Sequence, residues 1–597
     1  MRATWALVGE ILAVLPAGAR RFFIGYSTIL GLLSILDGAA LALLAVVVTP
    51  LVSQEPLNLP IIGEITGVGQ FIVLGVVCLL IVLKGVLAMV ALWFATRRFA
   101  GYELAIGDRL FERYIAAPWV ERLRRNSADL VRISDISVAA TMANFLLPIA
   151  SIVGEVLNFA TVLGVLAIAQ PTTAIIAILY LGLIGVILFF VITRRTRQNA
   201  QVNLRYMQRT SRLVTEMIGA LKEITLRNKE RDIAKVVHEN REHQVRARSN
   251  VQFYAQVPRY VLETGIIGGF VLVGVAAFVT GDAASALTAV AVFGLAGFRL
   301  APSVIRFQSV LAQVAANTPH AQAVLDEIRI SEVATAGLAD RSHRELPEHP
   351  RSLVFDDVAF RYGPDAEDAV RGISLEIPFG SKVAFVGQSG AGKSTMVDLV
   401  LGLIEPTSGT IRVDDLPLHE VTRSWRSRVG YVPQDVALFD ATIAQNVALS
   451  WTGDIDEERV RQALRQAQLL TTVEARDDGI QSGVGERGLQ LSGGQRQRLG
   501  IARALYAEPL VLVMDEATSA LDTSTEAAVG GSIAALGDEV TVITVAHRLA
   551  TIRHADRIFF MSGGEIQAQG TFEELVKSVP EFATQAALAG LLGDDAR

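Results

Sequence analysis

The chain has 597 residues, of which 51% are hydrophobic and 19% are charged, and its formal net charge at pH 7 is −6. This length exceeds that of one ordinary domain, so at least two domains are expected. The mean hydropathy of +0.41 excludes a purely soluble enzyme, and the net negative charge argues against a nucleic-acid partner. The single cysteine, Cys78, excludes an intrachain disulfide and a multi-cysteine metal site.

The first 21 residues predict a short amphipathic helix at the membrane surface. Apolar residues recur there at the spacing of one helical face: Trp5, Val8, Ile11, Leu12 and Leu15. Arg20 and Arg21 follow the apolar stretch, whereas a cleaved signal peptide carries its positive charge before the apolar core. Residues 1–21 are therefore interpreted as an interfacial helix followed by a basic anchor.

Residues 22–325 predict a helical transmembrane domain. A spanning helix needs about 20 largely apolar residues. Six segments meet this condition: 22–52, 68–96, 138–169, 172–193, 254–280 and 285–315.

The distribution of basic residues predicts the orientation of these spans. The segments 97–137 and 194–250 are rich in Lys and Arg, whereas 53–67, 170–171 and 281–284 contain none. The positive-inside rule places the two basic loops and both termini in the cytoplasm. Each loop is expected to form two long helical extensions joined by a short crosswise element, near Pro118 and Trp119 and near Gly219; a simple solvated loop is the alternative. Residues 326–352, where the periodicity breaks, predict a linker to a second domain at 353–597.

A phosphate-binding loop follows the apolar strand-like run Val383–Val386. It reads Gly387, Gln388, Ser389, Gly390, Ala391, Gly392, Lys393, Ser394 and Thr395, and a helical pattern comes next. Glycines allow backbone N–H groups to surround a phosphate, and the helix N-terminus adds positive potential. Lys393 is expected to reach the terminal phosphates of ATP, and the Ser394 hydroxyl to bind Mg²⁺.

Two further motifs accompany this loop. The apolar strand 510–514 ends in Asp515, expected at Mg²⁺, and Glu516, expected to deprotonate the attacking water. Ser492, at the start of another helix, precedes two glycines and Gln495. Exposed N–H groups there predict a second anion site, with an ordinary helix N-cap as the alternative. Two phosphate-binding helix ends in one chain predict ATP clamped between two chains.

Together these motifs resemble an ABC-transporter nucleotide-binding domain, and their order fits that family. The resemblance implies that Tyr362 stacks on adenine, that Gln434 touches Mg²⁺, and that His547 contacts the terminal phosphate. With Glu516, the residues Gln434 and His547 are the expected catalytic residues. ATP contacts in cis are expected from Tyr362, 387–395 and Asp515. Contacts in trans are expected from Ser492, Gly493, Gly494, Gln495 and Asp522, and Mg²⁺ contacts from Ser394, Gln434 and Asp515.

Spans placed ahead of one ATPase domain resemble an ABC exporter half-transporter. The resemblance implies an all-α six-helix transmembrane domain plus an α/β P-loop ATPase domain with a helical subdomain. It further implies the type IV exporter fold, a domain-swapped homodimer, an inner-membrane location and a cytoplasmic ATPase domain. Because Glu516, His547 and the glycines of the second anion site are all present, a symmetric homodimer with ATP and Mg²⁺ as cofactors is expected.

Ionisable residues inside the spans bear on the substrate. Lys84, Arg259 and Arg299 are expected to form a cationic band in a water-filled cavity. The alternative is internal pairing, of Lys84 with Asp37 or Glu155 and of Arg259 with Glu263.

A cationic cavity suits an anionic amphiphile. The segments 256–263 and 298–303 resemble spans of bacterial lipid-linked oligosaccharide flippases. That resemblance implies transfer of a polyprenyl-diphosphate-linked oligosaccharide between leaflets. The alternatives are a multidrug, lipid or peptide exporter and, less favoured, a channel or regulator.

Overall fold

The computed structural model describes residues 2–53, 57–59, 63–65, 68–125, 127–169, 171–280, 283–335, 344–517, 522–534, 540–546, 549–589 and 591. The chain divides into two compact units. The first comprises Met1–Ala117 and Glu121–Ala336, and the second comprises Pro118–Val120 and Gly337–Arg597. Each unit has its own hydrophobic core.

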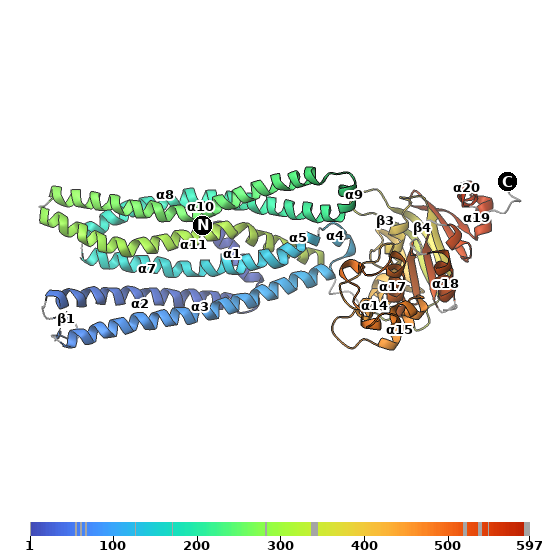
Figure 1. Cartoon of the computed structure of the whole chain (residues 1–597), viewed down its shortest axis with the longest axis horizontal. Helices are drawn as coiled ribbons and strands as arrows, with labels where there is room; N and C mark the ends of the chain where they lie inside the picture. Colours follow the sequence, from blue (N-terminus) through green and yellow to red (C-terminus); the bar gives the residue numbers. More distant parts are fainter. Residues whose placement is uncertain are drawn as a thin grey trace. The chain divides into compact units, whose positions relative to one another are not determined.

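The first unit is built from long helices joined by short connections (Figure 1). Its elements in chain order are α1 (Arg2–Val14), α2 (Ala19–Ser53), β1 (Leu57–Leu59), β2 (Gly63–Ile65), α3 (Val68–Ala116), α4 (Trp119–Leu123), α5 (Ser127–Arg132), η1 (Ile133–Ser137), α6 (Val138–Thr141), η2 (Met142–Leu146), α7 (Leu147–Ala169), α8 (Pro171–Gly219), α9 (Leu221–Leu226), α10 (Glu230–Thr280) and α11 (Ala283–Thr335). Helix α8 packs along α10, α11 packs against α10, α8 and α7, and α2 packs against α3 and α7.

Five of these helical stretches are long and apolar enough to cross a membrane. Within the described residues they contain Ala19–Leu36, Val68–Ala116, Asp129–Thr161, Ile178–Gly219 and Glu230–Val279. They coincide with the first five predicted spans. The sixth prediction, 285–315, lies within α11, where many side chains are outside the described part of the structure. Large apolar side chains such as Phe71, Met89 and Phe94 are exposed on α3, as expected of a surface that faces lipid.

The helices continue far beyond the apolar segments, as predicted for the two basic loops. Helix α3 runs to Ala116, and the five-residue α4 follows it; α8 runs to Gly219, and the six-residue α9 joins it to α10. The solvated-loop alternative is therefore wrong. Each loop is thus a helical continuation of the spans with a short crosswise element between its two arms.

Two predicted boundaries are wrong. The interfacial segment 1–21 ends earlier, because Pro16 and Gly18 separate α1 from α2, and Gly18 has a φ of +91°. The predicted linker 326–352 begins too early, because α11 continues to Thr335. Ile328 is buried with Val324 in the core of the unit, so the apolar periodicity persists into the segment predicted as linker.

Most of the apolar face of helix α1 packs against other helices of the first unit. Leu7, Val8, Ile11 and Leu15 are buried among residues of α3, α7 and α11. The predicted apolar face exists, but protein covers it within the first unit.

The second unit contains two sheets. One has the order β12-β11-β5-β10-β9-β8, with β12 antiparallel to β11 and all other neighbours parallel; the other is the antiparallel sheet β4-β3-β6-β7. The bounds are β3 (Ser352–Phe360), β4 (Val370–Pro378), β5 (Lys382–Gly387), β6 (Ser408–Val413), β7 (Leu416–Pro417), β8 (Val429–Val432), β9 (Val511–Asp515), β10 (Thr541–Val545), β11 (Arg557–Ser562) and β12 (Glu565–Gly570). Residues 383–386 of β5 and 511–513 of β9 are buried, as expected for strands covered on both faces.

Helices surround this mostly parallel sheet. They are α12 (Lys393–Val400), η3 (Leu418–Glu420), α13 (Thr422–Arg426), α14 (Ile443–Ala448), α15 (Glu457–Gln466), α16 (Leu470–Glu474), η4 (Gly479–Gln481), η5 (Glu486–Gly488), α17 (Gly493–Tyr506), α18 (Thr523–Ala534), η7 (Leu549–Ile552), α19 (Phe572–Ser578) and α20 (Pro580–Leu588). Helices α14, α15 and α17 pack on one another and share a core separate from that of β3, β4 and α12. This cluster is the predicted helical subdomain.

Candidate nucleotide-binding site

The predicted site residues come from one edge of the parallel sheet. Strand β5 ends at Gly387 before the phosphate loop, β8 ends at Val432 before Gln434, and β9 ends with Asp515 before Glu516. Carboxyl ends of parallel strands meet at the same edge, which is where open α/β sheets bind their ligands. The fold therefore brings together groups that lie more than a hundred residues apart in the chain.

The side chain of Lys393 folds back onto the phosphate loop and is hydrogen-bonded to it. Its ammonium group donates to the carbonyl oxygens of Gly387 at 2.7 Å and Gln388 at 2.8 Å. Burial lowers the pKa of Lys393, while the nearby carboxylates of Glu516 and Asp515 favour its charged form. The lysine is thus held against the loop with opposite charge beside it, in the position predicted for binding phosphate.

Gly392 shows why this loop needs glycine. It precedes α12 with a φ of +95°, a backbone conformation that L side chains rarely adopt. A Cβ atom there would lie 2.5 Å from the carbonyl oxygen of Ala369. The tight turn that aims the N-terminus of α12 at the phosphate site therefore excludes any side chain.

Glu516 is held by its own backbone and by Gln434. The amide nitrogen of Gln434 donates to Oε2 of Glu516 at 2.9 Å, and the backbone N–H of Glu516 donates to the Val545 carbonyl at 3.1 Å. Glu516 has a φ of +50°, which is uncommon for a residue other than glycine. Backbone strain of this kind concentrates at functional sites. The structure therefore places Glu516, the predicted base, in direct contact with the amide of Gln434, the predicted Mg²⁺ ligand.

Tyr362 lies beside the phosphate loop. Its hydroxyl is 3.2 Å from Oγ1 of Thr395 on α12, and its ring meets the ring of Phe360 edge-on. Its stacking on adenine stays a prediction.

Ser492 is the N-cap of α17. Its hydroxyl accepts from the backbone N–H of Gln495 at 3.3 Å, and the Gln495 side chain accepts from the backbone N–H of Ser492 at 3.0 Å. The N-cap alternative is therefore confirmed for the free chain. The Ser492 side chain is exposed at this helix end, so a role in binding phosphate from a partner chain stays a prediction.

Asp522 also acts as a local cap. Its carboxylate accepts from Ser524 Oγ and from the backbone N–H and Oγ1 of Thr525, and these bonds lower its pKa. His547 lies outside the described residues, so its predicted contact with the terminal phosphate stays a prediction.

Two contacts near the site were missed by the sequence analysis. Tyr431 on β8 is hydrogen-bonded to Asp515. Burial, together with the charges of Asp515 and Asp398, raises the Tyr431 pKa to about 12. Asp398, on the helix that starts at Lys393, accepts a hydrogen bond from Trp119. No sequence pattern signals these contacts, because each joins segments that only the fold brings together.

Trp119 belongs to the loop between the second and third predicted spans but packs in the second unit. With Val120 it covers the core formed by β3, β4 and α12. Burial raises the pKa of Asp398 to about 6; the hydrogen bond from Trp119 opposes this shift, and the charge of Asp515 adds to it. The crosswise turn of this loop is therefore bound directly to the helix that begins at the phosphate loop.

The donor groups at this edge are suited to Mg²⁺. Ser394, Gln434 and Asp515 offer a hydroxyl, an amide oxygen and a carboxylate, the oxygen ligands that Mg²⁺ prefers. Because the amide nitrogen of Gln434 is engaged by Glu516, its oxygen is the atom available for a metal. Among the described residues no group of three or more His, Cys, Asp or Glu side chains forms a metal cage.

Comparison with known proteins agrees with this geometry. Residues 370–519 match the family model of the ABC transporter domain. The chain is 44% identical over 227 residues to the ATP-dependent lipid A-core flippase of Cupriavidus pinatubonensis, a match that covers 38% of each chain. It is 44% identical over 249 residues to the flippase of the same name from Bordetella pertussis, covering 41% of this chain and 40% of the relative. The chain thus matches about two fifths of the length of these relatives.

The whole chain resembles a solved exporter structure. A bacterial Atm1-family ABC exporter with ATP bound superposes with a TM-score of 0.74 at 21% identity, over 98% of this chain and 100% of that chain. The chain has the fold of a type IV ABC exporter half-transporter. The predicted combination of a helical membrane domain with an α/β P-loop ATPase domain is confirmed.

Residues 370–519 thus belong to an ABC-type ATPase domain, a kind of domain that binds ATP. The apolar helices of the first unit and this fold make the chain a multi-pass protein of the inner membrane with a cytoplasmic ATPase domain. The predicted location is confirmed.

Replacement of Glu516 by Gln tests the assignment of the catalytic base. The variant keeps a polar partner for Gln434 but cannot accept a proton. We expect ATP affinity within about threefold of the natural protein and a turnover lower by a factor of about 10²–10⁴, the range that general-base catalysis contributes. Nucleotide binding and phosphate release measured on the full-length protein check both values. A Glu508→Gln variant, changed at a position on the turn before β9, is the control, and brisk hydrolysis by Glu516→Gln would contradict the assignment.

Replacement of Asp398 by Asn tests the effect of burial on this carboxyl group. A folded-state pKa of about 6, above the ordinary value of 3.8, means that folding favours the protonated form. This stabilisation is lost as the pH rises through about 6. The asparagine side chain of the Asp398→Asn variant resembles the protonated acid and can still accept from Trp119.

The loss begins near the unfolded pKa of 3.8 and is complete above about 6, so we expect Asp398→Asn to melt at a higher temperature than the natural protein, by a margin that is larger at pH 7.5 than at pH 5. Thermal unfolding of the full chain at both pH values provides the measurement. Asp477→Asn, at an exposed position, is the control and should change neither midpoint. An equal difference between Asp398→Asn and natural protein at both pH values would refute the shift.

Proposed function

We propose that two copies of this chain form an ATP-driven flippase that moves an anionic, lipid-like amphiphile from the inner to the outer leaflet. The arrangement of Lys393, Gln434, Asp515 and Glu516 at one sheet edge carries the ATPase part of this proposal. The exporter fold supports the transport part. The names of the curated relatives, lipid A-core flippases, favour a lipid-like substrate.

For ATP hydrolysis, Lys393 and Glu516 would exchange their present protein partners for the nucleotide and the attacking water. Lys393 would leave the carbonyl groups of Gly387 and Gln388 for the phosphate oxygens, which offer it full negative charge. Glu516 would accept the proton of a water molecule that attacks the terminal phosphorus, and ADP would leave as the P–O bond breaks. When bound, Mg²⁺ at Ser394, Gln434 and Asp515 neutralises charge on the phosphates.

A homodimer completes the site. The exposed N-terminus of α17, with Ser492 as its cap, offers a second set of backbone N–H groups for phosphate. Lys393 and Ser492 would hold the same ATP molecule from opposite chains. ATP would bind the closed dimer more tightly than the open one and so shift the protein toward the closed state. Only such a difference in ATP affinity between the two states can drive the membrane helices to another arrangement.

The crosswise elements α4 and α9 are the proposed levers. Trp119 of α4 packs with Val120 on the core of the ATPase domain and bonds to Asp398. Because α4 follows α3 directly, movement of the ATPase domain would be passed to a helix that continues into the membrane.

The finer proposal for the substrate is a polyprenyl-diphosphate-linked oligosaccharide, supported by the resemblance of segments 256–263 and 298–303. The structure changes the charge argument for the cationic band. Arg259 forms an ion pair with Glu263 at 2.9 Å, as the alternative predicted, and Glu155 pairs with Arg306 at 3.2 Å. Lys84 is half-buried on α3, and the side chains of Arg299 and Asp37 lie outside the described part. Of the three residues of the proposed cationic band, Arg299 is the main candidate to bind an anionic head group.

A paired substitution tests this substrate class. The change of Arg259 and Arg299 to Ala should lower flipping of a fluorescent polyprenyl-diphosphate glycan at least tenfold in proteoliposomes, because a diphosphate loses its cationic partners. ATP-driven uptake of a neutral drug should change less than twofold.

The control is Arg246→Ala, which removes an exposed arginine from the cytoplasmic part of the same helix α10. Unchanged flipping of the diphosphate lipid by the double variant would remove the proposed substrate and favour a drug, lipid or peptide exporter.

A further inference from the structure

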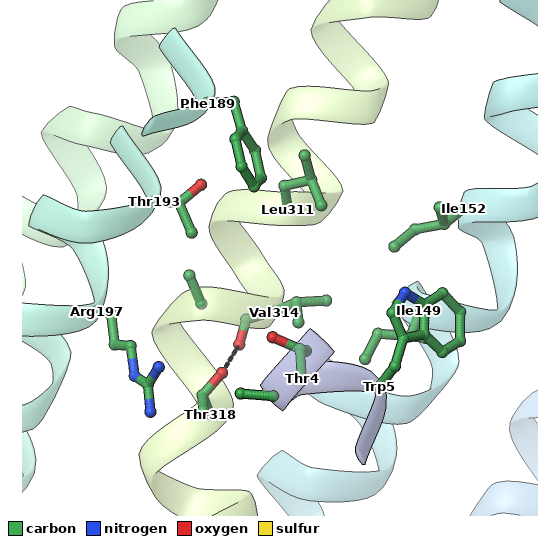
Figure 2. A pocket seen from close by; sticks show the side chains of 12 residues that line it. Thr4, Trp5, Ile149, Ile152, Phe189, Thr193, Arg197, Leu311, Val314 and Thr318 are labelled. Carbon is green, nitrogen blue, oxygen red and sulfur yellow. Dashed lines mark hydrogen bonds between the residues drawn. The ribbon is translucent and has the colours of Figure 1, made fainter. Parts of the chain in front are cut away.

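A cavity of about 140 Å³ lies inside the first unit (Figure 2), and its lining residues do not include Lys84 or Arg259. Four helices form its wall: α1, α7, α8 and α11. The lining residues include Trp5, Ile152, Phe189, Arg197, Leu311 and Thr318. Its volume is comparable to that of an engineered apolar cavity of about 150 Å³ that binds benzene. It can therefore hold part of one hydrocarbon chain but not a whole lipid.

The cavity is apolar at one end and cationic at the other. Figure 2 shows Phe189 and Leu311 together at one end, and Arg197 and Thr318 at the other. Phe189 and Arg197 are eight positions apart on α8, a distance of roughly 12 Å along a helix. A ligand that fills it must be an amphiphile with a negatively charged head.

Arg197 is the unusual residue of this site. It is half-buried, and no hydrogen bond or ion pair joins it to any residue that the structure describes. The hydroxyl of Thr318 donates instead to the Val314 carbonyl at 2.8 Å. A phosphate group would offer this guanidinium group charge-assisted hydrogen bonds.

Helix α1 closes the cavity. The side chains of Leu7, Val8 and Ile11 are buried against the other helices of the unit. Glu10 of the same helix forms an ion pair with Arg329 at 2.9 Å. The first turn of α1, with Thr4 and Trp5, is left to form one side of the cavity, as Figure 2 shows. Trp5 remains 45% exposed. A chain could thus enter beside this residue without unfolding the bundle.

We propose that this cavity binds one acyl chain of an anionic phospholipid from the inner leaflet, with the lipid phosphate on Arg197. Arg194 and Arg195 precede Arg197 on α8, just after the apolar part of the fourth span. Basic residues at this position lie at the level of the anionic head groups of the cytoplasmic leaflet. The lipid is a resident ligand that anchors α1 to the bundle, so this site is separate from the path of the transported substrate.

Native mass spectrometry of the delipidated full-length protein tests the site. Phosphatidylglycerol is the anionic probe, and phosphatidylcholine with the same chains is the zwitterionic probe. The natural protein should retain phosphatidylglycerol at least tenfold more strongly than phosphatidylcholine. Arg197→Gln should lose this preference, Arg197→Lys should keep most of it, and Arg195→Gln, changed at an exposed neighbour on the same helix, should keep all of it.

A second variant tests the apolar end without removing a charge. Ala315 is buried and lines the cavity, so Ala315→Leu should fill the space and lower phosphatidylglycerol retention at least fivefold. Its thermal midpoint, measured without lipid, shows whether the bundle remains folded. Equal retention by Arg197→Gln and Arg195→Gln, or full retention by a folded Ala315→Leu protein, would overturn the proposal.

The resident role is tested separately from transport. Bound phosphatidylglycerol should stay on the protein during ATP turnover, and release of one molecule with each turnover would overturn the assignment as a resident lipid. Retention depends on neither ATP nor the glycolipid flipping assay. Loss of flipping of the polyprenyl-diphosphate lipid would therefore refute the proposed substrate and leave this site standing.

Discussion

The proposed ATP-dependent pairing of two chains depends on the balance of charge at the carboxyl edge of the parallel sheet. Asp515 and Glu516 are negative and lie beside one lysine, Lys393, which is buried and bonded to two backbone carbonyl groups. A triphosphate adds further negative charge to an edge that already has two carboxylates. Lys393 and the N-terminus of α12 alone leave that charge poorly compensated. Under the account proposed above, the metal ion and the N-terminus of α17 from a second chain supply the rest, which makes ATP a link between the two chains.

Short local patterns made the ATP site predictable from the sequence. The glycines and Lys393 follow a buried strand directly, and Asp515 and Glu516 end another, so both motifs carry their structural context within about fifteen residues. The structure confirms the strand, loop and helix positions. The bond between Gln434 and Glu516, by contrast, follows only from the parallel pairing of β8 with β9.

The features that escaped prediction depend on packing between distant segments. Nothing near Trp119 in the sequence indicates that its side chain reaches Asp398, and nothing near Tyr431 indicates Asp515. The apolar periodicity of α1 was visible, but periodicity alone does not tell whether lipid or protein covers the apolar face. For the same reason the end of α11 was misplaced, because charged residues after Asp326 masked buried positions such as Ile328.

Two arginines in the predicted spans of the helical unit pair with carboxylates in the part of the chain that the structure describes. Arg259 pairs with Glu263 and Arg306 with Glu155, because an unpaired charge is costly where lipid replaces water. Arg197 stands at the basic end of its span beside an apolar cavity, and its proposed partner is a lipid phosphate. Pairing within the protein and pairing with lipid are thus two solutions to the same energetic problem.

A mixed dimer tests the central claim, that each ATP lies between two chains. Lys393→Ala in one chain and Ser492→Arg in the other place both defects in the same shared site and leave the second site whole. Purification through two different affinity tags isolates the mixed dimer. The account predicts that each variant alone loses ATP hydrolysis and that the mixed dimer binds one ATP at a complete site. A mixed dimer that binds nucleotide no better than either variant alone would contradict the account.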